Sequence, residues 1–113
     1  MQSVTSNAVA ESIGEWEQLF ISSTVAVIRG LETKNGKYLS LHFNGLGSSQ
    51  GALITTLAEK WRPKTAVRAP IFADAYAGFI QVNSTGVINV YSLVGSGSFD
   101  IRGDCLILIE TEI

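Results

Sequence analysis

Apolar and polar residues alternate along most of this chain with a period of two. From Trp16 onward, short alternating runs are separated by Gly, Ser and Asn, a pattern typical of half-buried strands joined by turns. We count about eight to ten such strands at close spacing, without a helix between them. The pattern therefore predicts a mainly β, antiparallel sandwich or jelly roll rather than a parallel sheet.

The clearest alternation runs from Phe79 to Tyr91. A three-residue loop at 84–86, with Gly86 in the left-handed conformation, joins like with like in four pairs: Val82 with Ile88, Ile80 with Val90, Gln81 with Asn89 and Phe79 with Tyr91. A two-residue loop would set Val82 against Asn89 and turn one apolar set to the wrong face. We therefore expect the longer loop, with Phe79 and Tyr91 on the outer face.

Asn35-Gly36 predicts a second hairpin, between strands at 24–34 and 37–44. Pairing across that two-residue loop sets Ile28, Gly30 and Glu32 opposite Phe43, Leu41 and Leu39 on the core face. The other face is mixed, with Arg29 opposite His42, Leu31 opposite Ser40, and Thr33 opposite Tyr38. Further along we expect a loop at 45–51, a strand at 52–57 and an extended piece at 65–69. Because Pro63 and Pro70 bound that piece, we expect it near an edge.

Two features of the chain favour an oligomer. The run Cys105 to Ile109 is apolar on both faces, whereas an antiparallel sheet commonly leaves one face to water. Residues 4–14 form the one predicted helix, which is too short to be stable alone in water, and its Val9 and Ile13 share a face. Because the period of two begins only at Trp16, we divide the chain into a short N-terminal helix at 1–15 and a β-sandwich domain at 16–113.

Length and charge narrow the classes of partner. With 113 residues the chain suits one domain. It has 8 basic and 10 acidic residues, a net charge of -2 and no basic stripe, so we do not expect nucleic-acid binding. Charged residues make up 16% of the chain against roughly 25% in an average domain, which also favours buried subunit contacts. No apolar run approaches the roughly 18 residues of a membrane span, and the start lacks signal-peptide features.

The order of motifs in the second half resembles a known family. Lys60-Trp61-Arg62-Pro63 is followed by an extended segment and then by the hairpin at 78–91. This order resembles the C-terminal tip domain of tail-fibre and receptor-binding proteins of tailed bacteriophages and prophages. The opening Val4-Thr5-Ser6-Asn7-Ala8-Val9 is similar to a segment that often precedes such tips. Residues 15–57 share only their strand-like character, and Glu59 and Lys60 stand where the family commonly has Gly or Pro.

The resemblance implies a homotrimeric, non-enzymatic tip that attaches a virion to a bacterial cell-surface saccharide. Such a protein is made in the bacterial cytoplasm, is joined to upstream fibre or baseplate proteins, and works outside the cell on the phage tail. The helix would then be the neck of the trimer, with Val9 and Ile13 on the three-fold axis. Because the helix begins so close to Met1, we expect the chain to be the distal part of a longer fibre. A purely structural trimerisation or capping domain is the alternative.

Several side chains are candidates for contacts. Arg29, Tyr38 and His42 on the mixed face can hydrogen-bond a sugar, although an exposed or interface histidine is the simpler interpretation. Phe79 and Tyr91 are predicted to lie in a subunit interface rather than on a ligand platform. Trp16 and Trp61 are expected to pack, Trp61 at the sandwich end with Arg62 bonding loop carbonyls, rather than to stack on a sugar.

The sequence offers little for cofactor or catalytic chemistry. One histidine and one cysteine are too few ligands for a metal site, and we expect no cofactor. Cys105 lies in an apolar run and is predicted to be a buried, inert thiol. Asp100 and Asp104 are the only candidates for a paired-carboxylate, glycan-cleaving site, and aspartates flanking Arg102-Gly103 are more often turn formers and charge partners. We therefore expect a binding protein rather than an enzyme.

Overall fold

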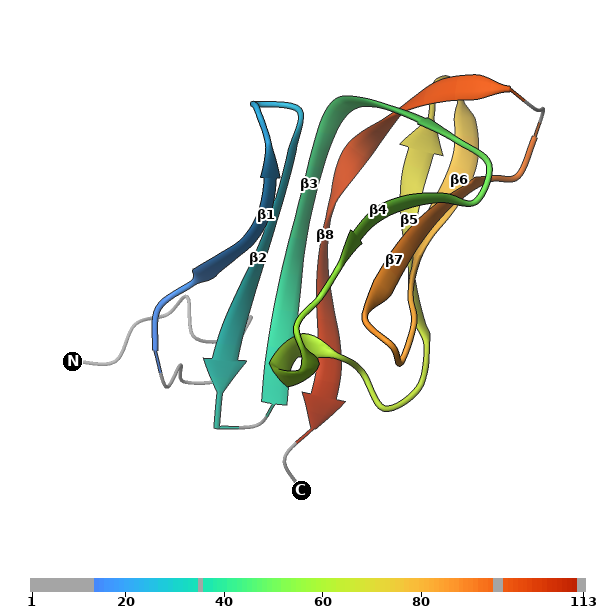
Figure 1. Ribbon diagram of the computed structural model, residues 1–113. Helices are drawn as coiled ribbons and strands as arrows, with labels where there is room; N and C mark the ends of the chain where they lie inside the picture. Colours follow the sequence, from blue (N-terminus) through green and yellow to red (C-terminus); the bar gives the residue numbers. More distant parts are fainter. Residues whose placement is uncertain (1–13, 35, 95–96, 112–113) are drawn as a thin grey trace.

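All strands of the structure belong to one antiparallel sheet. The computed structural model in Figure 1 describes residues 14–34, 36–94 and 97–111. Its elements are, in order, β1 (Glu17–Ser22), β2 (Ala26–Thr33), β3 (Gly36–Ser49), β4 (Ala52–Thr56), the 3-10 helix η2 (Glu59–Trp61), β5 (Val67–Ala73), β6 (Tyr76–Val82), β7 (Val87–Ser92) and β8 (Ser98–Thr111). The strands lie in the order β1-β2-β3-β8-β5-β6-β7-β4. The sheet curls until it nearly closes into a barrel.

The prediction of a mainly β, antiparallel domain is confirmed, and its finer details differ. The strands form one continuous curled sheet, and a jelly roll is not shown. The helix predicted at 1–15 lies outside the described residues except for Gly14 and Glu15, which are not helical. Within 14–34, 36–94 and 97–111 the only helical element is η2, and no helix there is long and apolar enough to cross a membrane.

The core fills the inside of the curled sheet because alternate residues of each strand point inward. Its largest fully buried side chains come from five strands and are Phe43, Ile28, Leu39, Leu41, Ile80, Ile88, Ile101, Val82 and Val90. Burying one such side chain contributes about 1.5–3 kcal/mol. The described part leaves no buried side-chain nitrogen or oxygen without a hydrogen-bond partner. The period of two therefore specifies which face of each strand forms the core.

The hairpin of β6 and β7 has the predicted register. Phe79 pairs with Tyr91, and the three inner pairs follow as expected. Gly86 closes the three-residue loop with φ of 89°, and its N–H donates to the Asn83 carbonyl over 2.8 Å. A side chain at Gly86 would also place Cβ 2.5 Å from the Leu57 carbonyl oxygen. Both the left-handed backbone and this close approach require glycine here.

The hairpin of β2 and β3 has a loop one residue earlier than predicted. Thr33 pairs with Gly36, so Ile28 lies opposite Leu41 and Arg29 opposite Ser40. The Thr33 side chain explains the difference, because its hydroxyl donates to the Gly36 carbonyl over 2.8 Å and accepts from the Gly36 N–H over 3.1 Å. The change moves each partner by two positions, so the predicted core face is still correct.

The loop predicted at 45–51 is wrong. β3 continues to Ser49, because β8 pairs with it along its whole length as far as Ser49 and Ser98. Gly45 absorbs the irregularity as a bulge between Asn44 and Leu46, with φ of 92°. This segment rich in glycine and serine therefore forms a strand as far as Ser49, because β8 lies beside it there.

The extended piece predicted at 65–69 lies further along the chain, as β5, and includes Pro70. β5 lies between β8 and β6 in the sheet, but Val67 to Ile71 pair with β6 alone, so the expectation of a position near an edge is correct for this part of the strand. Its pairing with β8 is confined to Phe72 with Arg102 and Ala73 with Ile101. Pro70 pairs with Phe79 of β6, and its carbonyl faces Cys105 of β8. Its missing N–H is therefore on the β8 side, where the strands are not yet paired.

Trp61 fills the core as predicted. Its side chain is 2% exposed, and it lies so close to Gly30 that a Cβ there would be 2.6 Å from the indole ring. Arg62 Nε donates to the Leu57 carbonyl over 3.1 Å, which confirms its expected role in the loop. Lys37 Nζ donates to the Lys60 carbonyl over 2.9 Å and fastens η2 to β3.

Candidate functional site

The outward side chains of β2, β3 and β8 form one surface, which we call the β2–β3–β8 face. It consists of Val27, Arg29, Leu31, Tyr38, Ser40, His42, Asp104, Leu106 and Leu108. The strand registers arrange these residues in rows across the sheet. One row holds Arg29, Ser40 and Leu106, and a second holds Val27, His42 and Asp104. The third row, Leu31, Tyr38 and Leu108, is apolar apart from a phenol.

A hollow of about 150 Å³ lies at the polar centre of this face, lined by Val27, Arg29, Ser40 and His42. The structure therefore brings together Arg29 and His42, two of the three predicted saccharide-binding residues. They are diagonal neighbours on adjacent strands, and such residues lie about 7–8 Å apart. The hollow is open to solvent and is built on two adjacent internal strands of the sheet.

Tyr38, the third predicted residue, points from the same face but does not line the hollow. It lies opposite Leu31 on one side and Leu108 on the other. The sequence analysis missed the contributions of Ser40 and Asp104. Ser40 could have been found from the corrected hairpin register. No local sequence pattern indicates that Asp104 belongs to the site, because it reaches His42 only through the pairing of β8 with β3, 62 residues away in the sequence.

His42 is oriented by Asp104. The Nδ1 atom of His42 is paired with Oδ1 of Asp104 across the β3–β8 register. An ionised carboxylate only accepts hydrogen bonds, so Nδ1 carries the hydrogen and the other ring nitrogen, Nε2, is left for a ligand. Neutral imidazole presents an acceptor there, which suits a sugar hydroxyl, and protonated imidazole presents a donor.

Arg29 is exposed and has no hydrogen-bond or ion-pair partner among residues 14–34, 36–94 and 97–111. Ser40 lies directly opposite it, and Gln18 of β1 lies on its other side. A guanidinium presents five N–H donors in a fixed fork. The hollow therefore has a fixed positive charge at one side and a histidine at the other.

Apolar side chains border the hollow on β8. Leu106 is 49% exposed and Leu108 is 43% exposed, while Cys105, Ile107 and Ile109 face the core. The prediction of a last strand that is apolar on both faces is thus confirmed. Within the described part of the chain, nothing covers the outer leucines, and this leaves a surface suited to another protein.

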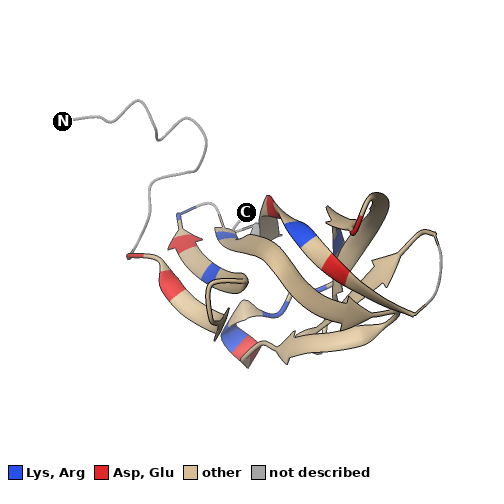
Figure 2. Ribbon diagram, turned by 90° about the horizontal axis from the view of Figure 1, so that it is seen from above, with Lys and Arg blue, Asp and Glu red and all other residues tan. Residues whose placement is uncertain are grey.

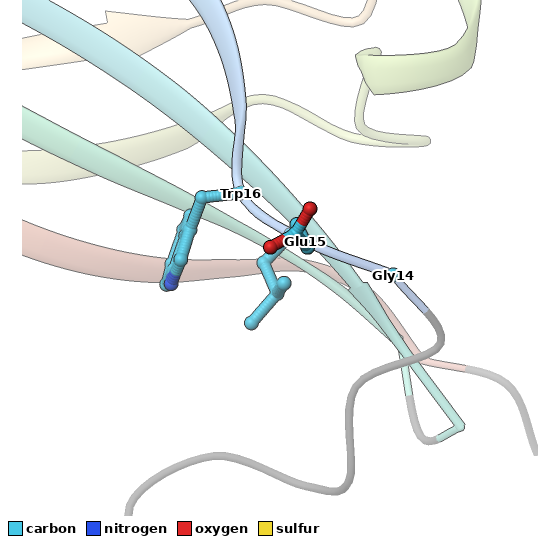
Figure 3. A pocket seen from close by; sticks show the side chains of 4 residues that line it. Gly14, Glu15 and Trp16 are labelled. Carbon is cyan, nitrogen blue, oxygen red and sulfur yellow. The ribbon is translucent and has the colours of Figure 1, made fainter.

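Trp16 is less buried than expected, with 42% of its surface exposed. Together with Gly14, Glu15 and Leu31 it lines a hollow of about 460 Å³ beside the start of β1, as Figure 3 shows. Leu31 is only 6% exposed although it points outward. The hollow adjoins residues that the structure does not describe, so we assign no ligand to it.

A third hollow, of about 320 Å³ and lined mainly by apolar residues, lies where β5 separates from β8. It is lined by Pro70, Ile71, Phe72, Ala77, Gly78, Gly103 and Asp104. Cys105 Sγ donates to the Pro70 carbonyl beside this hollow, over 3.0 Å. Partial burial, and then the charge of Asp104, raise the pKa of the Cys105 thiol. The thiol is half-buried rather than buried, and its raised pKa makes it a poor nucleophile.

The outward side chains of β5, β6 and β7 form a contrasting surface, which we call the hairpin face. Phe79 and Tyr91 stack with ring centroids 5.0 Å apart, and the Arg68 guanidinium lies 4.8 Å from the Phe79 centroid. Beside them runs a series of hydrogen bonds: Arg68 Nε to Gln81 Oε1 at 2.8 Å, Gln81 Nε2 to Asn83 Oδ1 at 2.8 Å, and Asn83 Nδ2 to Asn89 Oδ1 at 3.1 Å. The predicted outward pair is confirmed, but its rings contact each other and Arg68.

The geometry does not favour a carboxylate pair for glycan cleavage. Asp100 and Asp104 lie in β8, not in a turn, and are four residues apart along an extended strand, which is roughly 13 Å at about 3.3 Å per residue. Paired glycosidase carboxylates are roughly 5 to 9.5 Å apart. The contact of Asp100 with another carboxylate is made by its backbone: the Asp100 N–H donates to Asp74 Oδ1 over 3.0 Å. The described residues contain no group of three or more His, Cys, Asp or Glu that could hold a metal.

Comparisons with known proteins assign no family. No family model matches the sequence, and no curated protein is significantly similar to it. The resemblance to phage fibre tips therefore rests on the residues quoted for it alone. Val9 and Ile13, the predicted axis residues, lie outside the described residues.

Proposed function

We propose that this protein is the tip domain of a phage tail fibre, which attaches the virion to a saccharide on a bacterial cell surface. The observation that carries the proposal is the hollow on the β2–β3–β8 face. Its polar side chains, Arg29, Ser40 and His42, point outward from paired strands instead of bonding one another. The assignment to a phage tail fibre comes from the order of motifs in the second half of the chain.

Saccharides suit this hollow for a chemical reason. A sugar offers several hydroxyls, each of which can donate and accept a hydrogen bond. Arg29 donates, the Ser40 hydroxyl does both, and His42 Nε2 accepts or donates according to its protonation. Because these side chains are attached to paired strands, less backbone ordering opposes binding than in a mobile loop.

The proposal includes a homotrimer. Leu106 and Leu108 on β8 support self-association, since their exposed surfaces lie side by side and gain free energy on leaving water. The number of three copies, the likeness to sandwich or jelly-roll tips, and the fibre or baseplate partners come from the resemblance. Three tethered sites would raise the overall affinity above that of one weak site by about 10²- to 10⁴-fold. Val9, Ile13, Phe79 and Tyr91 stay predictions as interface residues.

The test is adsorption to bacterial cells and to their purified surface polysaccharides. We compare the unaltered chain with an Arg29→Ala, His42→Ala double variant and with Lys64→Ala, a matched loss of one exposed positive charge outside the face. The double variant should bind at least about tenfold more weakly, because each lost charged hydrogen bond contributes about 1.5–3 kcal/mol. Lys64→Ala should bind normally. Absence of binding to every polysaccharide by a correctly assembled protein would refute the proposal.

A structural cap of the tail apparatus is the second candidate, and the exposed leucines of β8 favour it. A cap needs Leu106 and Leu108 for assembly but makes no use of the neighbouring hollow. It predicts stable oligomers that bind no cells, and an Arg29→Ala, His42→Ala variant that assembles normally. Adsorption and oligomeric state measured on the same samples distinguish the two functions.

A further inference from the structure

We infer that the hollow at Arg29, Ser40 and His42 recognises a negatively charged substituent, a phosphate or a carboxylate, on the saccharide. The saccharide part of this inference rests on the proposed function. The charge preference rests on the local arrangement of charged groups on the β2–β3–β8 face.

The exposed charge of Arg29 supports binding of an anion. Its guanidinium has no carboxylate partner among residues 14–34, 36–94 and 97–111. Elsewhere in those ranges the side chains of Lys60 and Arg68 have partners, Glu32 and Gln81 respectively, whereas Lys64 and Arg102, like Arg29, have none there. A guanidinium binds phosphate and carboxylate oxygens through two parallel N–H donors, and such charged bonds are about twice as strong as neutral ones.

The charged residues around the hollow come from three strands. β2 contributes Arg29, β3 contributes His42, and β8 contributes Arg102 and Asp104, while Gln18 of neighbouring β1 is neutral. Asp104 is paired with His42. Over the described residues, charges of both signs are interspersed (Figure 2). The net charge of -2 therefore does not decide binding here, because exposed charges beyond about 8 Å are largely screened at physiological salt.

Asp104 also gives the ligand a direction. Its carboxylate lies beyond His42 from Arg29, since the row of Val27, His42 and Asp104 runs from β2 to β8. An anionic group is repelled from that end and attracted to the Arg29 end. A hydroxyl next to the anionic group then faces Nε2 of His42, which Asp104 orients through Nδ1.

The size of the hollow limits what enters it. Pockets that enclose drug-sized ligands have volumes of roughly 300–1,000 Å³, and this hollow has about 150 Å³. It therefore accepts one substituent and its attached carbon, while the sugar ring lies above the sheet. Apolar Val27 at the wall keeps part of the hollow free of competing polar groups.

The test uses the full chain labelled with ¹⁵N and three soluble probes: glucose 6-phosphate, glucuronate and glucose. Titrations followed by NMR should shift the Arg29 side-chain signal and the amide signals of Ser40 and His42. We expect the charged probes to bind about 10- to 100-fold more tightly than glucose, from the strength of charged hydrogen bonds. The two charged probes distinguish phosphate from carboxylate recognition.

Arg29→Ala and Arg29→Gln should each abolish the difference between charged and neutral probes, and Lys64→Ala should retain it. Amide spectra that match the unaltered protein establish that a variant is folded, and using two substitutions at Arg29 guards against one that is not. Glucose binding as tightly as the charged probes, or shifts confined to other surfaces, would overturn the inference.

The inference and the proposed function fail differently. If the protein adsorbs to cells and Arg29→Ala adsorbs equally well, a saccharide is bound without Arg29, and only the charge inference is wrong. If charged probes shift Arg29 but no cell or polysaccharide is bound, the hollow recognises anions and the fibre-tip function is wrong.

Discussion

The two outer faces of the curled sheet have similar residue types but use them differently. On the hairpin face, Arg68, Gln81, Asn83 and Asn89 bond one another, and the two aromatic rings stack. On the β2–β3–β8 face, Arg29 has no partner in the described part of the chain, and Leu106 and Leu108 are exposed. The polar side chains of the first face bond one another, whereas Arg29 and the two leucines of the second face are exposed to solvent.

This difference shows why residue type alone does not identify a binding surface. Arginine, amides and aromatic rings are the groups expected in a saccharide site, and the hairpin face contains them all. A ligand there would have to displace hydrogen bonds that already exist, so its net gain would be small. On the β2–β3–β8 face a ligand replaces only water. We therefore expect mutations on the first face to affect stability and those on the second to affect binding and assembly.

The largest effect on stability is expected at Trp61, which lies in the core between β2 and the hairpin of β6 and β7. Its segment lies against the hairpin loop at Gly86, and its ring packs on Gly30 of β2. Trp61→Ala should lower the free energy of unfolding by about 3–5 kcal/mol, because it removes a buried aromatic side chain and leaves a cavity. Chemical denaturation followed by circular dichroism measures this loss.

Trp16→Ala is the matched control, since that tryptophan is 42% exposed. It should lose much less stability than Trp61→Ala. Equal losses for the two variants would contradict the larger contribution expected from the buried Trp61.

The next effect is expected from Asn83→Ala on the hairpin face. The Asn83 amide accepts from Gln81 and donates to the Val87 carbonyl and to Asn89. Its removal leaves these part-buried groups without partners and should cost about 1–3 kcal/mol. Asn44→Ala, at an exposed position of β3, should change stability by less than about 0.5 kcal/mol. Denaturation midpoints compare the two.

The same variant sharpens the comparison of faces. Asn83→Ala should bind saccharide as the unaltered protein does, at a temperature where both are folded. Loss of binding by this variant, with Arg29→Ala unaffected, would move the site to the hairpin face.

A smaller effect on folding, but a clear one on assembly, is expected from Leu106→Asn with Leu108→Asn. Both leucines are exposed in the single chain, so the free energy of unfolding of the monomer should change little. If copies associate through β8, the double variant should sediment as a monomer at micromolar concentration. Leu53→Asn with Leu93→Asn, at other exposed leucines, is the control and should remain assembled. An unaltered chain that is itself monomeric would contradict the trimer.

The smallest effect is expected at Cys105, where β8 separates from β5. Burial, with a smaller contribution from Asp104, raises the pKa of this thiol, so the folded protein favours the neutral form. Iodoacetamide should react more slowly with the native protein than with the urea-unfolded chain at pH 8, because the thiolate is the nucleophile. The corresponding stability is present below the ordinary thiol pKa and is lost as the pH rises through the raised value.

Asp104→Asn tests the cause of this shift. It removes the smaller contribution only, so alkylation should become modestly faster and remain slower than in the unfolded chain. Equal rates in the native and unfolded protein would show that Cys105 is not protected by burial.

Much of the fold could be predicted because its signals are local. The register from Phe79 to Tyr91 follows from alternation and from a glycine that the loop requires. The core position of Trp61 and the bond from Arg62 to a loop carbonyl follow from the proline-bounded motif. Local patterns did not predict the exact register of the β2–β3 hairpin. Its loop lies one residue before the Asn-Gly position, because the Thr33 hydroxyl bonds to the backbone of Gly36.

The candidate site was half predictable. Arg29 and His42 lie on adjacent strands of one hairpin, so alternation alone places both on the same face. Asp104, which orients His42, comes from a strand 62 residues away. No local pattern shows which distant strand will pair with β3, and the glycine-serine segment at 45–51 looked like a loop until β8 was found beside it.

The sequence by itself determined which side of each strand is apolar, because side chains alternate strictly along an extended backbone. It also determined that β8 carries leucines it cannot bury within its own sheet. Only the tertiary structure decided the order of strands, and with it the partner of each polar side chain. That order brought Asp104 to His42, and it left Arg29 without a partner among the residues that the structure describes. The hydrogen bonds of the hairpin face join residues that are close in the sequence. The β2–β3–β8 face needs β8 beside β3, and no local pattern determines this pairing because it depends on the packing of the whole core.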